Sequence, residues 1–269
     1  FDIIIAAAVY EELSQLLDRV EKPVVSRVGG REVTSGRIEG KSVRLIVTGP
    51  GLVNTVQSLT AAIENFRPAL IIQTGCAGAF KESGLRIGDI GIATEEIDLH
   101  LGIEPGNGSL LLKDLPFSLI KRCDLNVKNR YSINNELVEI ALQVVKKGSG
   151  FDRVRFKKGP FITVSTITAT EKRAKDIYKH FQPCMESMEG SGAAFLSLYY
   201  GISFLEIRSV SNIAGKRDLT AWNLPLAFER GGMAVFALIS NLSDRIFTTE
   251  NAENFFGTNS EKVLTNSEL

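Results

Sequence analysis

Residues 185–190 read Met-Glu-Ser-Met-Glu-Gly, and residues 202–212 read Ile-Ser-Phe-Leu-Glu-Ile-Arg-Ser-Val-Ser-Asn. The first segment places two acidic residues at a strand end, and the second is a buried strand that ends in polar residues. A helix rich in small residues, from about Glu189 to Tyr200, separates them. Alternating strands and helices predict a mostly parallel or mixed sheet, with polar side chains gathered at the carboxyl ends of its strands.

The same alternation continues along the whole chain. The predicted strands are 2–8, 24–28, 32–38, 43–48, 69–74, 90–94, 159–165 and 203–210, and the predicted helices are 10–20, 53–66, 135–147, 171–180, 189–200 and 225–245. Gly29-Gly30 and Glu39-Gly40 separate three strands and are typical of hairpin turns. We therefore expect a three-layer α/β fold, in which helices flank a mixed, twisted sheet. Residues 1–247 form one domain in this interpretation, and 248–269 form a polar tail.

Polar residues follow several of the predicted strands. In open α/β sheets ligands bind beyond the carboxyl ends of strands, so these ends are expected to converge on one site. The strand ends concerned are Ala8, Thr48, Gly75, Ser165, Met188 and Ser211.

Composition excludes several classes of function. The net charge is zero, which argues against general electrostatic binding to nucleic acid or to an anionic membrane. No apolar run reaches the roughly 18 residues of a membrane span. Three separated cysteines and only two histidines, His100 and His180, make a metal site improbable, so no metal or cofactor is expected and carboxylates should perform acid–base chemistry. The odd cysteine count without a secretion signal favours the cytoplasm, and the start at Phe1 rather than Met leaves the native N-terminus open.

Six short strings occur in order along the chain. They are Ala-Ala-Val-Tyr-Glu-Glu (7–12), Thr-Gly-Pro-Gly (48–51), Thr-Gly-Cys-Ala-Gly (74–78), Ile-Gly-Asp-Ile (87–90), Met-Glu-Gly (188–190) and Arg-Ser-Val-Ser-Asn (208–212). On these strings, residues 2–243 resemble the nucleoside phosphorylase and nucleosidase superfamily. Ser-Asn-Ile-Ala-Gly-Lys-Arg-Asp (211–218), followed by Trp222, is most similar to the futalosine hydrolase branch.

The resemblance implies a purine nucleosidase that cleaves the N-glycosidic bond of a 6-oxopurine riboside. The expected substrate is futalosine, which would yield hypoxanthine and dehypoxanthine futalosine in menaquinone biosynthesis. The alternatives are a methylthioadenosine/S-adenosylhomocysteine nucleosidase, a nucleoside phosphorylase, or a noncatalytic nucleoside-binding protein on the same fold. The resemblance also implies a homodimer or larger homo-oligomer, and the segment 100–118 is the candidate for reaching a neighbouring subunit.

Glu12 is the candidate for binding and activating water, a role that the resemblance implies. Taken alone, its position is more typical of an acid at a helix N-terminus, and the resemblance is what favours the catalytic role. An acid here would repel phosphate and therefore favours hydrolysis over phosphorolysis. Glu11 is the alternative if the register differs by one residue.

Glu189 is the candidate ligand of the ribose, because a carboxylate accepts bonds from both ribose hydroxyls and faces the cation that develops on the sugar. Its alternative is a helix-start acid. Met188 would pack on the sugar or base, with a simple core position as its alternative. Glu186 is interpreted as a solvated acid, with a functional role as the alternative.

Asn212 is the candidate for the purine edge, where adenine-specific relatives carry Asp. One amide donor and one carbonyl acceptor suit a 6-oxopurine, although a strand-end turn Asn is the alternative. The resemblance implies that Arg208 helps to place the attacking water, and a structural salt bridge is its alternative.

Five further residues are candidates for substrate contact. Cys76 stands where related nucleosidases often have Ser, and the small residues Ala77 and Gly78 allow a ligand to approach their peptide groups. Arg217, or Lys216 beside it, together with Trp222 would meet an aromatic carboxylate on the 5′ side of the substrate. A solvated loop with one anchoring aromatic residue is the alternative.

Overall fold

A ten-stranded mixed sheet forms the centre of the molecule. The computed structural model describes residues 2–106, 111–122 and 125–243 of the 269-residue chain. The sheet order is β11-β10-β6-β12-β5-β1-β4-β3-β2, with β9 paired to β6. The strands of this sheet are β1 (Asp2–Ala7), β2 (Glu21–Val28), β3 (Arg31–Ile38), β4 (Lys41–Val47), β5 (Leu70–Ala79), β6 (Ile90–Asp98), β9 (Arg130–Ser132), β10 (Phe156–Thr163), β11 (Met185–Ser187) and β12 (Ser203–Ile213).

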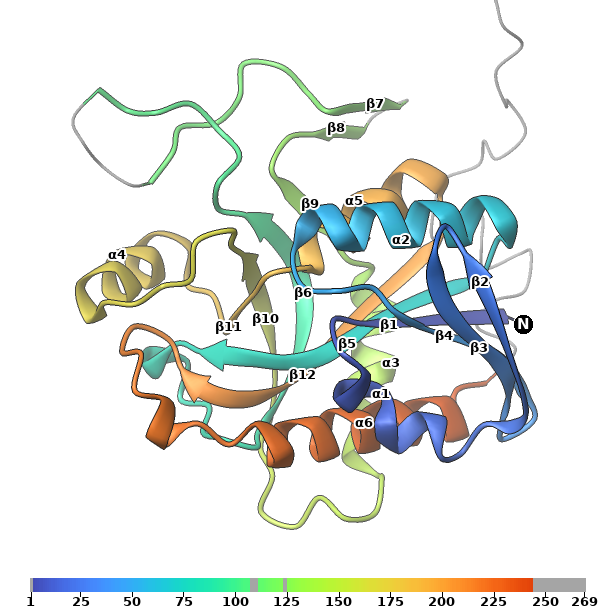
Figure 1. Ribbon diagram of the computed structural model, residues 1–269. Coiled ribbons are helices and arrows are strands. Elements are labelled where there is room, and N and C mark those ends of the chain that lie inside the picture. The colour runs from blue at the N-terminus through green and yellow to red at the C-terminus, as the bar shows by residue number, and fades with distance from the viewer. Residues whose placement is uncertain (1, 107–110, 123–124, 244–269) are drawn as a thin grey trace, which may run out of the picture.

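Helices cover both faces of this sheet. The helices are α1 (Tyr10–Leu17), α2 (Leu52–Asn65), α3 (Asn135–Lys146), α4 (Glu171–Phe181), α5 (Gly190–Tyr200) and α6 (Leu224–Asn241). Figure 1 shows α2 and α5 side by side on one face, while α1, α3 and α6 cover the other. The expected three-layer α/β architecture is therefore confirmed.

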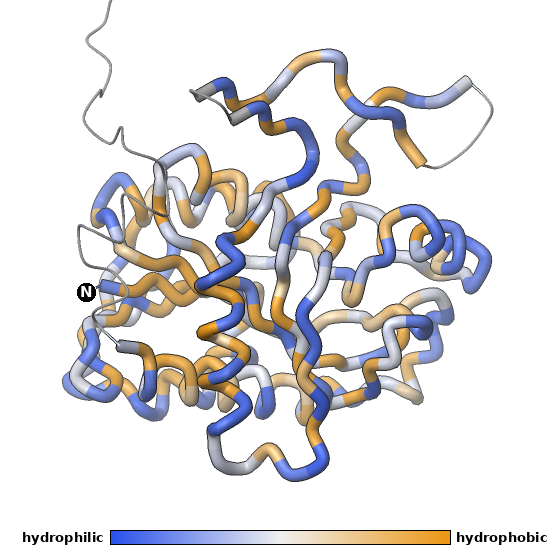
Figure 2. Tube along the Cα trace, turned by 180° about the vertical axis from the view of Figure 1, so that it is seen from behind, coloured by the Kyte–Doolittle hydropathy of each residue, from blue (hydrophilic) through white to orange (hydrophobic). Residues whose placement is uncertain are grey.

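The core forms around β1, β5 and β12, whose residues are buried on both faces. Parallel strands with helices on each side have no solvent-facing side, so their sequences are continuous apolar runs such as Ile3 to Ala7 and Leu70 to Ile72. Figure 2 shows this as apolar inner strands within hydrophilic loops and outer helix surfaces.

The two predicted hairpin turns join β2, β3 and β4. Gly29 and Gly30 have φ values of 57° and 81°, and Glu39 and Gly40 have 49° and 75°. Two successive residues with positive φ match the twist of antiparallel strands, which explains why glycine occurs in both turns.

Three predicted strands are longer than expected: β6 continues to Asp98, β12 continues to Ile213, and β5 passes the predicted end at Thr74. β5 does not end before Gly75 but continues to Ala79, and β12 pairs with it over this whole length. The extension persists because β11 pairs antiparallel with its last residues while pairing parallel with β10. β5, β12, β6, β10 and β11 thereby form a closed ring of paired strands, and the residues from 75 to 79 lie within the sheet.

Three strands in the connection between β6 and α3 were missed by the sequence interpretation. They are β7 (Ile120–Arg122), β8 (Leu125–Val127) and β9. Each spans only three residues, too few for a periodic pattern to develop. Within 100–118, Ile103 bridges to Lys113, and Figure 1 shows this connection extending away from the body. Residues 107–110 and the predicted tail 248–269 lie outside the described residues, and α6 ends at Asn241.

Candidate active site

Arg208 of β12 lies at the centre of a buried polar cluster, with 1% of its surface exposed. Its Nε donates to Oε1 of Glu206 at 2.6 Å, and its Nη1 donates to the carbonyl of Cys76 at 3.0 Å. Its Nη2 donates to Oε2 of Glu189 at 3.0 Å. Burial lowers the pKa of this guanidinium, but Glu206, Glu189 and Glu12 raise it above its ordinary value, so the charge is retained.

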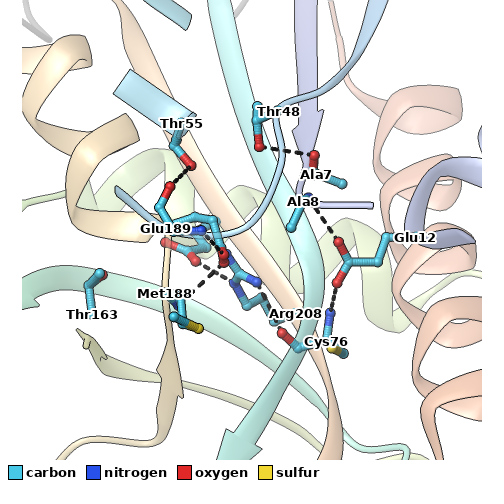
Figure 3. Close-up of polar contacts among 12 residues, drawn as sticks. Ala7, Ala8, Glu12, Thr48, Thr55, Cys76, Thr163, Met188, Glu189 and Arg208 are labelled. Atoms are coloured by element: carbon cyan, nitrogen blue, oxygen red, sulfur yellow. Dashed lines mark hydrogen bonds and ion pairs between the residues drawn. The ribbon is translucent and has the colours of Figure 1, made fainter. Parts of the chain in front are cut away.

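Glu189 is the residue that precedes α5, and both oxygens of its carboxylate accept hydrogen bonds from the protein. Besides Arg208, the backbone N–H of Gly51 donates to its Oε1 at 2.9 Å, and the N–H of Met188 lies 3.3 Å from its Oε2. Gly51 has a φ of 89°, which this conformation of the 48–51 loop requires. The loop after β4 and the segment after β11 therefore hold one carboxylate between them (Figure 3).

Glu12 approaches the same cluster from α1. Its Oε2 accepts from the backbone N–H groups of Ala8 at 2.9 Å and Val9 at 3.2 Å, and its Oε1 accepts from Cys76 at 2.8 Å. Burial raises its pKa above 4.5, although Arg208 and the backbone donors oppose that shift. A carboxyl with a raised pKa is suited to accept a proton near neutral pH.

Residues 76–78 connect this acidic cluster to Asn212. The N–H of Cys76 binds Glu12 and its carbonyl binds Arg208. Asn212 pairs with Gly78 across the strands, and a Cβ added to Gly78 would lie 3.1 Å from the Asn212 amide nitrogen. The Ser211 hydroxyl donates to Oδ1 of Asn212 at 2.8 Å, which leaves Nδ2 on the Gly78 side.

A cavity of about 230 Å³ adjoins Asn212. Asn212, Trp222 and Lys216 line it, together with residues of α4. The Arg217 guanidinium lies 5.9 Å from the centre of the Trp222 ring, so it contacts the aromatic face. Lys216 is 4.0 Å from Asp218 in an exposed ion pair. The structure thus brings Trp222 and Asn212 to the same cavity, whereas Glu12, Glu189 and Arg208 lie at the other end of the 76–78 strip.

A family model described as the phosphorylase superfamily matches residues 2–258. This chain belongs to the phosphorylase superfamily. Among its relatives is a 5′-methylthioadenosine/S-adenosylhomocysteine nucleosidase of Geobacillus sp. (strain WCH70), 27% identical over 243 residues that cover 89% of this chain and 98% of the relative. A nucleosidase of the same description from Bacillus licheniformis is 29% identical over 217 residues, which cover 80% and 87% of the two chains.

Solved structures of the superfamily share the fold. The methylthioadenosine/S-adenosylhomocysteine nucleosidase of Colwellia psychrerythraea 34H, in complex with adenine, has a TM-score of 0.77 and 21% identity, covering 90% of this chain and 95% of its own. The futalosine hydrolase of Helicobacter pylori strain 26695 has a TM-score of 0.76 and 19% identity, covering 90% and 98%. At these identities the likeness concerns the fold.

The structure corrects the interpretation of Glu186 and decides between Glu11 and Glu12. Glu186 was interpreted as solvated, which is wrong, because only 7% of its surface is exposed. β11 pairs Glu186 with Gly78, and the N–H of Thr168 donates to its carboxylate at 3.1 Å. Glu11 is exposed at the helix surface, whereas Glu12 is 3% exposed, so only Glu12 reaches the cluster.

Sequence reasoning missed two acids behind Arg208. Glu206 and Glu96 are both fully buried. Glu206 carried a usable signal, because it lies two residues before Arg208 in an apolar strand and therefore faces the same side. Glu96 carried none, since it is brought to the cluster by the pairing of β6 with β12.

In the described part of the chain, no group of three or more His, Cys, Asp or Glu is arranged to hold a metal ion. No helix in that part combines the length and the apolar character needed to cross a membrane.

Proposed function

We propose that this protein is a purine nucleosidase, which hydrolyses the N-glycosidic bond of a purine nucleoside with water. The observation that carries the proposal is the joint burial of Glu12 and Glu189, each held by backbone N–H groups and both close enough to Arg208 to raise its pKa. Burying charged carboxylates costs free energy even when they are paired, so two of them beside one guanidinium favour a functional role over a purely structural one.

Each carboxylate has a separate task in this reaction. Cleavage develops positive charge on the ribosyl group, and the Glu189 carboxylate would oppose it while accepting bonds from the ribose hydroxyls. Glu12 would accept a proton as the water oxygen bonds to the anomeric carbon, while the bonding electrons leave with the purine. Burial raises the pKa of Glu12 above its ordinary value, which makes its carboxylate a stronger base.

The surroundings of Glu12 favour water over phosphate as the nucleophile. Backbone N–H groups at the ends of strands and the start of a helix are the usual donors to phosphate. Here the N–H groups of Ala8, Val9 and Cys76 donate to Glu12 instead. A carboxylate that occupies these donors would repel a phosphate dianion.

The first candidate activity is that of a 5′-methylthioadenosine/S-adenosylhomocysteine nucleosidase. The curated relatives that align over most of both chains carry this description. They support this alternative better than the futalosine assignment expected from the sequence.

Futalosine hydrolysis is the second candidate, and one observation favours it. Asn212 replaces the Asp expected of adenine-specific enzymes, and its amide presents both a donor and an acceptor suited to a 6-oxopurine. Arg217 beside Trp222 would bind the substrate carboxylate. In the variant R217A we expect discrimination between futalosine and carboxylate-free inosine to be lost with the fold retained, and unchanged kinetics would exclude this contact.

One incubation series separates these assignments. The protein is incubated with methylthioadenosine, S-adenosylhomocysteine, futalosine and inosine in phosphate-free buffer, then with added phosphate, and free base is measured by chromatography. Adenine without phosphate supports the first assignment, and hypoxanthine from futalosine supports the second. Product only with phosphate would contradict hydrolysis. Binding without any product would identify a noncatalytic nucleoside-binding protein.

Assembly is a separate expectation. We expect a homodimer or a larger homo-oligomer, with 100–118 near the neighbouring subunit, and sedimentation velocity tests it. A monomer at micromolar concentration would contradict it.

A further inference from the structure

Glu96 and Glu206 form a buried carboxyl pair directly behind Arg208. Both residues are 0% exposed, and a Cβ built on Gly190 would lie within 2.5 Å of one oxygen of each, so the two carboxyl groups lie side by side. Two adjacent buried carboxylates would repel each other strongly, because ionised carboxyl oxygens can only accept hydrogen bonds and the protein interior screens their charges poorly. One of the two groups must therefore carry a proton.

The remaining hydrogen bonds locate that proton. Oε1 of Glu206 accepts from Arg208 Nε at 2.6 Å, which favours the ionised form of Glu206. Oε2 of Glu96 accepts from the Thr163 hydroxyl at 2.6 Å. Among the described residues, neither Glu96 Oε1 nor Glu206 Oε2 has a hydrogen-bond donor. A single proton on Glu96 Oε1, donated to Glu206 Oε2, satisfies both.

Gly190 places this pair against the start of α5. A Cβ at Gly190 would lie 2.3 Å from Glu206 Oε2 and 2.5 Å from Glu96 Oε1. The next residue, Ser191, donates its N–H to the Thr163 hydroxyl at 2.8 Å. The pair is thus linked to Glu189 in two ways. It packs against Gly190, the next residue in the chain, and Glu206 binds the same Arg208 guanidinium that binds Glu189.

We propose that Glu96 and Glu206 share one proton and together carry a single negative charge, and that they act as a positioning pair for Arg208. Their charge offsets the positive charge of Arg208, so the negative charge of Glu189 remains available to stabilise the ribosyl cation. Without the pair, Arg208 and Glu189 would form a neutral ion pair that opposes the cation less strongly. This inference rests on the proposed nucleosidase function for its kinetic consequence. The shared proton itself is independent of that function.

Glutamine substitutions separate charge from hydrogen bonding. In E96Q the amide can donate to Glu206, which stays ionised. In E206Q the amide can donate to Glu96, which then becomes the ionised partner. Each single variant keeps one negative charge and the hydrogen bond between the residues. The double variant E96Q/E206Q keeps similar shape and hydrogen-bonding groups but has no charge.

The kinetics of these variants test whether catalysis needs the single negative charge of the Glu96–Glu206 pair. We expect each single variant to retain most of kcat, and the double variant to lose about 10- to 100-fold in kcat with little change in KM. The matched control is E95Q, because Glu95 lies on the same strand but forms a surface ion pair with Arg130. Equal kcat in the double and single variants would overturn the charge role, as would a full loss in either single variant.

Infrared spectroscopy tests the shared proton without any substrate. The wild type should show the carbonyl stretch of a protonated, buried carboxylic acid, and this band should be missing from the spectra of both E96Q and E206Q. Retention of the band in both variants would overturn the shared proton, even if the double variant does not fold. If no nucleoside is hydrolysed but the band behaves as expected, the proposed function fails and the one-proton pair stands.

Discussion

The Nη2 group of Arg208 donates a hydrogen bond to Oε2 of Glu189 at 3.0 Å, and both side chains are almost completely buried. The same guanidinium binds Glu206 and the Cys76 carbonyl, so its orientation is determined on three sides. A rigidly held guanidinium determines where the Glu189 carboxylate lies before any substrate arrives, and such preorganisation is what electrostatic stabilisation of a cation requires.

Replacement of Glu12 by glutamine should remove the general base. We expect E12Q to lower kcat by about 100-fold or more, since positioned proton transfer contributes rate factors of that order. Base release and circular dichroism are measured together. E11Q is the control, because Glu11 is exposed on the same helical turn. Comparable losses in both variants would assign the effect to the helix rather than to the base.

The raised pKa of Glu12 predicts a pH dependence of activity. The ionised carboxylate accepts the proton, so kcat/KM should rise with pH through a pKa above the ordinary value of 4.5. The pH profile of kcat/KM measures this. An acidic limb at or below that ordinary value would contradict Glu12 as the buried base.

The same shift predicts a pH dependence of stability with the opposite sign. The folded-state pKa exceeds the unfolded value, so protonated Glu12 stabilises the fold below the unfolded pKa, and this contribution is lost as pH rises through the folded pKa. Urea unfolding should therefore show E12Q gaining free energy of unfolding relative to wild type as pH rises above 4.5. A difference that is constant with pH would contradict the shift.

Alanine at position 190 should destabilise the protein. The added Cβ would lie 2.3 Å from Glu206 Oε2, and neither the buried pair nor the start of α5 has room to move. Overpacking of this kind costs about 1–3 kcal/mol in the free energy of unfolding. Thermal unfolding of G190A measures it. The control is G106A, where an added Cβ meets nothing within 4 Å, and equal melting temperatures would contradict the prediction.

The side chain at position 212 should influence the choice of base. A protonated aspartate can donate to N7 of adenine, whereas the asparagine amide suits a 6-oxopurine. We expect N212D to shift the ratio of kcat/KM for adenine over hypoxanthine nucleosides by about tenfold or more toward adenine. Competing hydrolysis of methylthioadenosine and inosine measures the ratio. No shift would mean that the base is recognised elsewhere.

The local pattern of apolar and turn-forming residues was sufficient to predict the main helices and strands of this fold. Apolar runs such as Ile3 to Ala7 and the paired glycines at 29–30 and 39–40 report burial and turn geometry directly, because both depend on neighbouring residues. Elements of three residues, such as β9 and β11, carry no periodic pattern, and they form only because long neighbouring strands provide hydrogen-bonding partners.

The sequence by itself determined the α/β class, and its resemblance to the nucleosidase superfamily singled out Glu12, Glu189 and Arg208 among the polar residues near strand ends. Only the tertiary structure decided that Glu186 is buried, that β5 continues through Gly75, and that Glu96 and Glu206 lie side by side. The physical reason is that burial and charge pairing depend on which strands are neighbours. That choice is made by the whole sheet and is not visible in any single segment.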